Sequence, residues 1–396
     1  MTNGLMALRV AMWGIVLFLC ALGMVMIAST TVYSRGPDMD PSFLIKQGIA
    51  LVAGLVAAWT VSRMGSDMLR QPWLVLLIGA GTLALLAVTP YIGQTRNGAT
   101  RWISLGPILI QPAELAKVAL IVVMAWYLIR VEEKVRVTWN GVLLPLIGFA
   151  VLSALVFRTR DLGSVVILAG VLWVMWLYSG ANWFYSSLLG ILCLPMALYV
   201  SVFKEGYRFD RMLAFINNPL SPHNEWAYQL RHSIIALGSG GNHGQGLGTG
   251  SFSQRGFVPE RHTDFIFSVI GEELGYWGTV GCAFAYLLLL VIGLMVAART
   301  RDLHQRLLVI GAVVLLVVQA FANMMVVTGL IPTKGLTLPF VSYGGSSLFV
   351  CLVAVGIIDA VVRQLTRSQP VVEASTTRIG AAVVSHRSAA LARSWS

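Results

Sequence analysis

The stretch "FVPERHTDFIFSVIGEELG", residues 257–275, gathers ionisable side chains beside an apolar run in a chain that otherwise carries little charge. A carboxylate placed there, such as Glu260 or Asp264, can act as a general base that takes a proton from a hydroxyl group. A neighbouring cation such as Arg261 can hold an anion such as a phosphate. These residue types predict a substrate that carries both phosphates and a hydroxyl to be deprotonated.

The membrane topology that the basic residues predict places further cations on the same face of the protein. They are Arg96, Arg101, Arg158, Arg160, Arg208, Arg211, Arg255, Arg261 and Lys334. The carboxylates expected on this face are few, chiefly Asp210, Glu260 and Asp264. A basic face around an isolated acid is the arrangement that such a substrate requires.

Other charged residues lie inside or at the ends of apolar runs, where a charge is costly. Glu114 and Lys117 in "QPAELAK" are three residues apart on one helical face and can pair, which favours a structural role. Asp161 is placed to cap the helix that follows it. Glu272 and Glu273 either orient their helix or bind a cation.

The elements that must position these residues are membrane helices. The chain is 57% hydrophobic and only 11% charged. Crossing about 30 Å of hydrocarbon takes roughly 20 apolar residues in a helix. About ten such runs occur, near 8–30, 43–62, 73–92, 113–130, 141–157, 162–179, 183–203, 265–298, 305–330 and 344–365. We therefore expect an all-α polytopic membrane protein with about ten transmembrane helices.

The distribution of basic residues predicts the orientation of these helices. With the N-terminus in the cytoplasm, the cytoplasmic loops and ends collect Arg9, Arg63, Arg70, Arg130, Lys134, Arg136, Arg299, Arg301, Arg306, Arg363 and Arg367. An even number of spans then returns the C-terminus to the cytoplasm. We expect one transmembrane domain over 1–366 and a disordered tail over 367–396. The net charge of +11 suits anionic lipids, and no nucleic-acid module is seen.

A long extracytoplasmic loop, residues 204–264, is predicted between the seventh and eighth helices. Within it, "EWAYQLRHSIIALG" places apolar residues on one helical face, which either lies in the membrane interface or packs on neighbouring helices. The glycine-rich "GSGGNHGQGLGTG", residues 238–250, permits close approach to a ligand or an anion, and a plain flexible turn is the alternative.

Four motifs resemble those of a known family in order and spacing. They are "NGATRWISLGPILIQPAELAK" (97–117), "GSGGNHGQGLGTG" (238–250), "PERHTDFIFSVIGEELG" (259–275) and "GLIPTKGLTLPFVSYGGSSL" (329–348). The chain thereby resembles the SEDS (shape, elongation, division and sporulation) family over nearly the whole transmembrane region. The segment "PTKGLTLPFVSYGGSS" is more similar to the division branch than to the elongation branch.

The resemblance implies a peptidoglycan glycosyltransferase that polymerises lipid II at the outer face of the bacterial cytoplasmic membrane, at the division septum. It implies Asp264 as the catalytic base. Candidates for contact with the pyrophosphate or the sugars are Arg101, Lys334, Arg261, His262, Ser342 and Gly344. A divalent cation, Mg2+ or Mn2+, is an additional expectation, with no protein ligands assigned, and no nucleotide is expected.

The resemblance also implies partners, namely a class B penicillin-binding protein with transpeptidase activity and other division proteins. Three alternatives remain at this level: an elongation-type polymerase, a lipid II flippase, and a division scaffold whose main role is to bind a partner. A flippase is expected to place ionisable groups along a path near the middle of the membrane, whereas most candidates here fall at the ends of spans.

Overall fold

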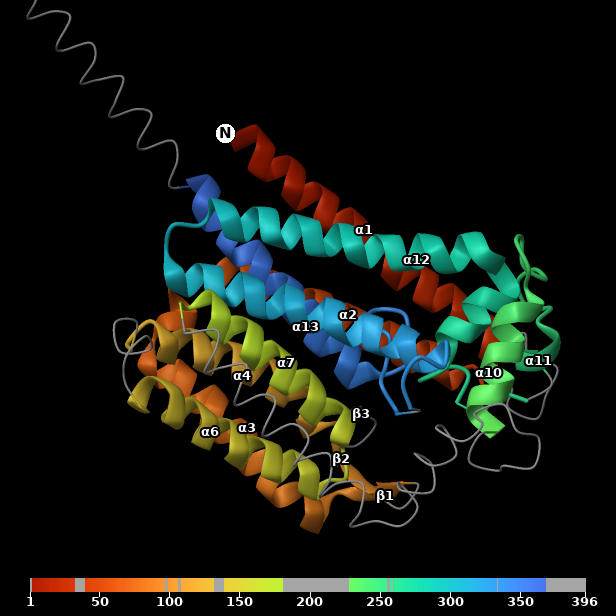
Figure 1. Ribbon diagram of the computed structural model, residues 1–396, viewed down its shortest axis with the longest axis horizontal. Coiled ribbons are helices and arrows are strands. Elements are labelled where there is room, and N and C mark those ends of the chain that lie inside the picture. Colours follow the sequence, from red (N-terminus) through yellow and green to blue (C-terminus); the bar gives the residue numbers. More distant parts are fainter. Residues whose placement is uncertain are drawn as a thin grey trace, which may run out of the picture.

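The computed structural model describes residues 2–32, 40–96, 99–105, 108–131, 139–180, 228–254, 257–258, 260–332 and 334–367. Its long helices run side by side, with their ends gathered at two opposite ends of the molecule (Figure 1). Six of the described helices are long and apolar enough to cross a membrane. This bundle confirms the helical polytopic class that the composition predicts.

The long helices follow the expected apolar runs. They are α1 (Thr2–Thr31), α2 (Ser42–Met64), α3 (Pro72–Ile92), α4 (Pro112–Leu128), α6 (Trp139–Arg158), α7 (Leu162–Tyr178), α12 (Ile266–Arg299), α13 (Leu303–Val327) and a last helix, Gly345–Arg367. A short 3-10 helix, η1 (Met68–Arg70), follows α2. The expected span at 183–203, the loop at 204–227 and the tail beyond 367 lie outside the described residues.

A small antiparallel sheet departs from the all-α expectation. Strands β1 (Gln94–Arg96), β2 (Ala99–Leu105) and β3 (Ile108–Ile110) form a meander between α3 and α4. Ile103 of β2 faces Ile110 of β3 in the register of the second pair. β1 and β3 have only three residues each, and the seven residues of β2 (ATRWISL) do not alternate strictly between apolar and polar, so periodicity gives no strand signal here.

The core of the bundle is built around α13, which packs against α12, α7 and α4. Nearly the whole length of α13 is buried, whereas α2 and α3 expose most of their apolar side chains. Close packing is possible because small residues lie at the contacts. A side chain at Gly293 of α12, for example, would meet Val313 of α13 at 2.6 Å.

The predicted helix in the long loop exists as α10 (Tyr228–Ser239). It packs against α12 and α13 with Leu230, Ser233 and Ala236 buried. Of the two interpretations of its apolar face, packing on neighbouring helices is therefore the one observed. A single turn of helix, α11 (Ser251–Gln254), follows it.

The glycine-rich segment after α10 is folded against the start of α12. Gly275 has φ 69° and breaks the helix there, so that the first turns of α12 are set off from the rest. Backbone amides of Gln245 and Gly246 donate to the carbonyls of Glu272 and Glu273, and Tyr276 donates to Gly241. The glycines thus allow two backbones to approach closely, and these two amides are not available to cradle an anion.

Candidate active site

Asp264 lies in the turn that leads into α12. The start of α12 is at the end of the molecule that carries the sheet and α10 (Figure 1). Asn323 of α13 donates through Nδ2 to the backbone carbonyl of Asp264 at 2.7 Å and to that of Leu336 at 2.5 Å. One amide from the buried helix therefore ties the Asp264 turn to the segment 329–344, which connects α13 to the last helix.

The backbone of that segment passes directly beside the carboxylate. A Cβ added at Gly335 would lie 2.9 Å from Asp264 Oδ2. Gly335 is exposed and Asp264 is partly exposed, so the carboxylate sits in a recess that still reaches the surface. Lys334, the residue before Gly335, is half-buried and has partners of its own.

The surroundings raise the pKa of Asp264 to about 7. The largest cause is burial, because the protein atoms around the carboxylate replace the water that would stabilise its charge. The negative charges of Glu260 and Asp161 raise the pKa further, and the positive charge of Arg101 lowers it. A carboxylate with a pKa near neutrality is well matched to take a proton from a hydroxyl group.

Arg101 on β2 is a cation whose charge acts on Asp264. Its guanidinium donates to the carbonyls of Thr159 (3.3 Å) and Arg160 (2.8 Å), at the end of α6. These bonds position the side chain without neutralising it, and no ion pair to Arg101 is seen within the described residues. The sheet that composition did not reveal therefore places a cation near the acid.

Asp161 caps α7, as the sequence predicts. Its Oδ1 accepts from the backbone amide of Ser164 at 3.1 Å, and its Oδ2 accepts from the Ser164 hydroxyl and from Gln111 Nε2. Arg160 before it has φ 62°, in the left-handed region. Asp161 thus serves the start of the helix and at the same time adds a negative charge near Asp264.

The other candidate contacts surround the same turn but are engaged within the protein. The Ser342 hydroxyl donates to the Thr263 carbonyl (2.6 Å), and the Gly344 amide donates to Gln47 Oε1 (3.1 Å). The Arg261 side chain is buried and donates to the Ser253 carbonyl. These bonds shape the turn, and substrate contact by Ser342, Gly344 or Arg261 stays a prediction.

His262 is half-buried between aromatic rings. Its ring centroid lies 4.8 Å from that of Phe43 and 5.8 Å from that of Tyr343, and its backbone carbonyl accepts from the Tyr343 amide at 2.8 Å. Tyr343 belongs to the connecting segment, so His262 also joins the turn to that segment. Contact with substrate by His262 stays a prediction.

Glu272 and Glu273 are buried and act on the structure. Glu272 accepts from the amides of Phe252 (2.6 Å) and Ser253 (3.0 Å), and so holds α11. Glu273 accepts from the Ser29 hydroxyl of α1, with both oxygens within 2.7 Å. Of the two roles considered for this pair, orientation of the helix is the one that these contacts support. Within the described residues, no cluster of three His, Cys, Asp or Glu side chains could hold a metal ion.

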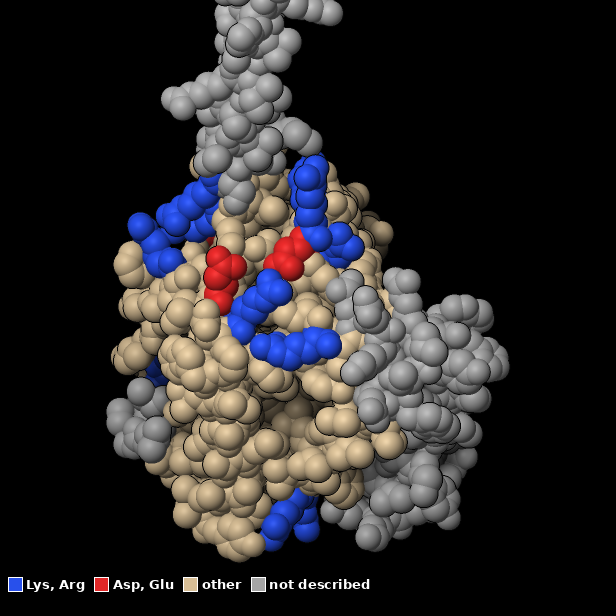
Figure 2. Space-filling view, turned by 90° about the vertical axis from the view of Figure 1, so that its left-hand side faces the viewer, with Lys and Arg blue, Asp and Glu red and all other residues tan. Residues whose placement is uncertain are grey.

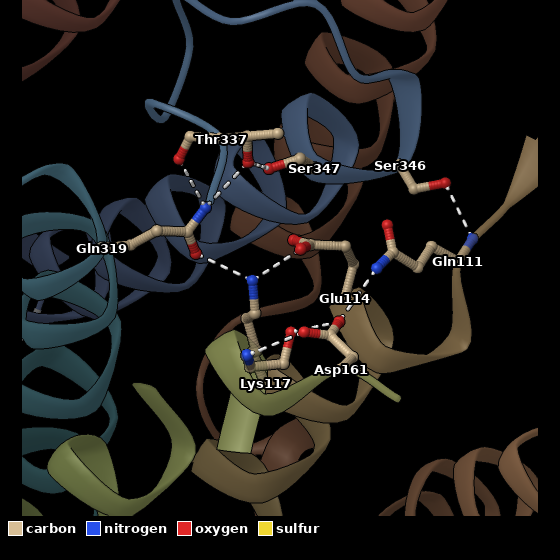
Figure 3. A network of polar contacts seen from close by, with 9 residues as sticks. Gln111, Glu114, Lys117, Asp161, Gln319, Thr337, Ser346 and Ser347 are labelled. Carbon is tan, nitrogen blue, oxygen red and sulfur yellow. Dashed lines mark hydrogen bonds and ion pairs between the residues drawn. The ribbon is translucent and has the colours of Figure 1, made fainter. Parts of the chain in front are cut away.

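Glu114 and Lys117 pair inside the bundle, as predicted, at 2.6 Å. Lys117 also donates to Gln319 Oε1 of α13 at 2.8 Å (Figure 3). Gln319 Nε2 in turn donates to the carbonyl and the hydroxyl of Thr337, two residues beyond Gly335. The buried pair is therefore connected to the segment that lies against Asp264.

Sequence reasoning missed three members of this framework, Gln319, Asn323 and Thr337. A signal for the first two was present, because they are polar residues four positions apart in the apolar helix α13, and that spacing puts them on one face. What the spacing does not contain is the identity of their partners, which lie in another part of the chain.

The fold and the site together define a multi-pass helical membrane protein with a carboxylate of raised pKa at one end of its bundle. The model of the FtsW, RodA and SpoVE family of cell cycle proteins matches residues 9–367. The chain belongs to this family, which confirms the resemblance drawn from the four motifs.

Curated relatives carry names from the division branch. The chain is 40% identical over 353 residues to the probable peptidoglycan glycosyltransferase FtsW of Geobacter metallireducens, covering 87% of this chain and 93% of that one. It is 36% identical over 354 residues to the protein of the same name from Legionella pneumophila, covering 87% and 88%. These similarities agree with the expected division branch.

Solved structures of similar proteins share the fold. The rod shape determining protein RodA of Thermus thermophilus matches with a TM-score of 0.65 at 29% identity, over 89% of this chain and 95% of that one. A chain of a peptidoglycan synthase complex, in which polymerization and crosslinking are structurally coordinated, matches with a TM-score of 0.74 at 28% identity, over 89% and 97%.

Proposed function

We propose that this protein is a peptidoglycan glycosyltransferase that polymerises lipid II at the outer face of the bacterial cytoplasmic membrane during septal wall synthesis. The observation that carries the mechanism is the position of Asp264, a carboxylate with a pKa of about 7 that lies beside the Gly335 backbone and is acted on by the positive charge of Arg101. The names of the relatives support the reaction class.

In the reaction, the 4-hydroxyl oxygen of the acceptor sugar attacks the anomeric carbon of the donor. Asp264 takes the hydroxyl proton as the new carbon–oxygen bond forms. The bond between the anomeric carbon and the pyrophosphate oxygen breaks at the same time, and undecaprenyl pyrophosphate leaves with the electron pair. One displacement converts the α-linked donor into a β-1,4 bond, so no covalent enzyme intermediate is required.

The pyrophosphate leaving group is already stable as an anion, so cations that bind it can replace the general acid that would otherwise protonate it. Arg101 is the best placed of them, because carbonyl bonds hold its guanidinium near Asp264 without neutralising it. Lys334 beside Gly335 is the second. A divalent cation stays a further expectation, and no step is assigned to it.

The expected partner is a class B penicillin-binding protein that crosslinks the glycan strands. The similarity to a chain of a peptidoglycan synthase complex supports this expectation. Under this proposal, Asp264 lies on the outer side, where the crosslinking partner also acts, and both termini lie in the cytoplasm.

The first test compares glycan chain length from labelled lipid II, with purified protein in the presence and absence of its penicillin-binding partner. Asp264→Asn is expected to yield no polymer while it still folds and binds the partner. Gly335→Ala is expected to lose most activity at unchanged melting temperature, since the added methyl lies 2.9 Å from Asp264 Oδ2 and displaces the carboxylate.

Gly238→Ala is the matched control, because nothing lies within 4 Å of a Cβ at that position of α10. It is expected to polymerise normally. Polymer from Asp264→Asn would remove the carboxylate from the mechanism. If the unaltered protein made no polymer, with or without its partner, the result would favour the flippase or scaffold alternative.

A further inference from the structure

A second concave feature lies at the opposite end of the bundle from Asp264. It is a pocket of about 230 Å³, lined by Met6, Arg9, Arg63, Arg363, Thr366 and Arg367. These residues come from the start of α1, the end of α2 and the end of the last helix. Figure 2 views this end of the molecule and shows Lys and Arg side chains gathered over it, with few Asp and Glu.

One carboxylate balances part of this charge, and it is fully engaged. Asp359 is 2% exposed and accepts from Arg9 Nε (2.5 Å), Trp13 Nε1 (3.2 Å) and the Ser62 hydroxyl (2.5 Å). Arg363 Nε lies 3.5 Å from Asp359 Oδ2, an ion pair without a hydrogen bond. Asp359 therefore fixes Arg9 and draws in Arg363, but it offers nothing more to the pocket.

The remaining two arginines have no carboxylate partner among the described residues. Arg63 lies over the ring of Trp59, with 5.2 Å between its guanidinium carbon and the ring centroid. The charged groups that act on Arg363 are Arg9, Asp359, Arg63 and Arg367, so positive charge is in excess. Like charges held this close around a hollow repel one another, and a bound anion would relieve that repulsion.

The rim of the pocket is apolar on the side of α1 and α2. Met6 lines the pocket, Trp59 lies under the Arg63 guanidinium, and the exposed Val10 and Met64 directly follow Arg9 and Arg63 in the chain. Arginines that can pair with a phosphate, beside a surface that can accept hydrocarbon, match the two parts of a phospholipid. A free phosphate would use only the arginines.

We propose that this pocket binds a phosphate group, supplied either by an anionic lipid head group or by a soluble phosphate, with the apolar rim favouring the lipid. The guanidinium groups of Arg63 and Arg367 contact the phosphate. Asp359 is a positioning residue, because it acts by holding Arg9 and Arg363 at the wall of the pocket.

The experiment measures the melting temperature of the purified full-length protein in neutral detergent. One arm titrates phosphatidylglycerol against phosphatidylcholine. The other titrates inorganic phosphate against chloride at equal ionic strength. The pocket variant is Arg63→Gln with Arg367→Gln, two exposed residues with no ion pair within the described residues. The matched control, Arg299→Gln with Arg301→Gln, removes the same charge from exposed positions outside the pocket at the same end.

We expect phosphatidylglycerol to raise the melting temperature and the pocket variant to weaken its apparent affinity by about fivefold for each arginine removed. The control variant is expected to change the affinity by a factor of less than about 2, because the charges it removes act on the lipid only at long range, where salt screens them. Arg63→Lys with Arg367→Lys is expected to retain part of the binding that the glutamine variant loses, because the positive charges remain. A purely structural effect of the substitutions does not predict this difference.

The two arms separate the sources of the phosphate. The site is assigned to a soluble ligand if inorganic phosphate stabilises the protein as much as the lipid does and the pocket variant abolishes that stabilisation. Equal weakening by the pocket and control variants would show a diffuse charge effect and overturn the proposal. So would the absence of stabilisation in both arms.

Discussion

At the scale of residues, opposing influences set the pKa of Asp264. Burial, the largest influence, makes its charged form unfavourable, and Glu260 adds to that effect, whereas Arg101 reduces it. The result is a carboxyl group that is ionised in part near neutral pH and can accept a proton there. A fully solvated aspartate would be ionised throughout this range but would be a much weaker base.

The pKa of Asp264 predicts how polymerisation depends on pH. Below about 7 the carboxyl is protonated and cannot accept the hydroxyl proton, so activity should rise as pH increases through about 7. Glu260→Gln removes a negative charge that raises this pKa, so the rise should move to lower pH. The measurement is the initial rate of glycan synthesis between pH 5 and 9.

Thr263→Ser, which keeps a hydroxyl for the contact with Glu260, is the control and should leave the rise in place. An unchanged pH profile in Glu260→Gln would show that another group limits the rate on the acid side.

At the scale of elements, α13 connects the parts of the site. Asn323 holds the Asp264 turn, and Gln319 joins the Glu114–Lys117 pair of α4 to Thr337 in the connecting segment. The amide side chains of Asn323 and Gln319 lie on one face of α13. They therefore hold both the turn that contains Asp264 and the connecting segment that passes beside its carboxylate.

Breaking the buried pair should destabilise the bundle. Lys117→Met leaves Glu114 as an uncompensated buried charge and is expected to cost roughly 3–5 kcal/mol of folding stability. Adding Glu114→Gln removes that charge and should recover a large part of the loss. Melting temperatures of the two single variants and the double variant, with lipid-facing Leu76→Met as the control, test this expectation.

The 2.6 Å contact predicts that the losses of stability in the two single variants do not add up in the double variant. A double variant whose loss equals the sum of the two single losses would contradict the prediction.

At the scale of the whole molecule, the bundle depends on close approach between helices at glycine. A Cβ at Gly356 of the last helix would lie 2.7 Å from backbone atoms of Ala58 in α2. One at Gly23 of α1 would lie equally close to Phe340 and Val341 of the connecting segment. In a membrane, where hydrocarbon surrounds the helices, such packing contacts are a main source of association.

Gly356→Ala should therefore lower the stability of the whole bundle, by about 1–3 kcal/mol, because backbone atoms cannot move aside as a flexible side chain can. Gly281→Ala on α12, with nothing within 4 Å of its Cβ, should be neutral. Thermal unfolding in detergent and in lipid compares the two, and equal melting temperatures would contradict the assigned contact.

The sequence by itself determined the class of the protein and singled out Asp264 as the candidate base. Long apolar runs locate membrane helices because hydrocarbon leaves no alternative for a spanning backbone, and four motifs in order single out one family. The Glu114–Lys117 pair and the Asp161 cap were also predictable, since both depend on residues within one turn of each other.

Only the tertiary structure decided which distant residues act on Asp264. The contacts of Asn323 and Gly335 with Asp264, and the charge of Arg101 that acts on it, come from segments far apart in the chain, and local spacing contains no information on such pairs. The same reason applies to the pocket at the other end, where α1, α2 and the last helix each contribute arginine. Each of these arginines alone is an ordinary residue at a helix end, and the pocket exists only because the fold brings the three helix ends together.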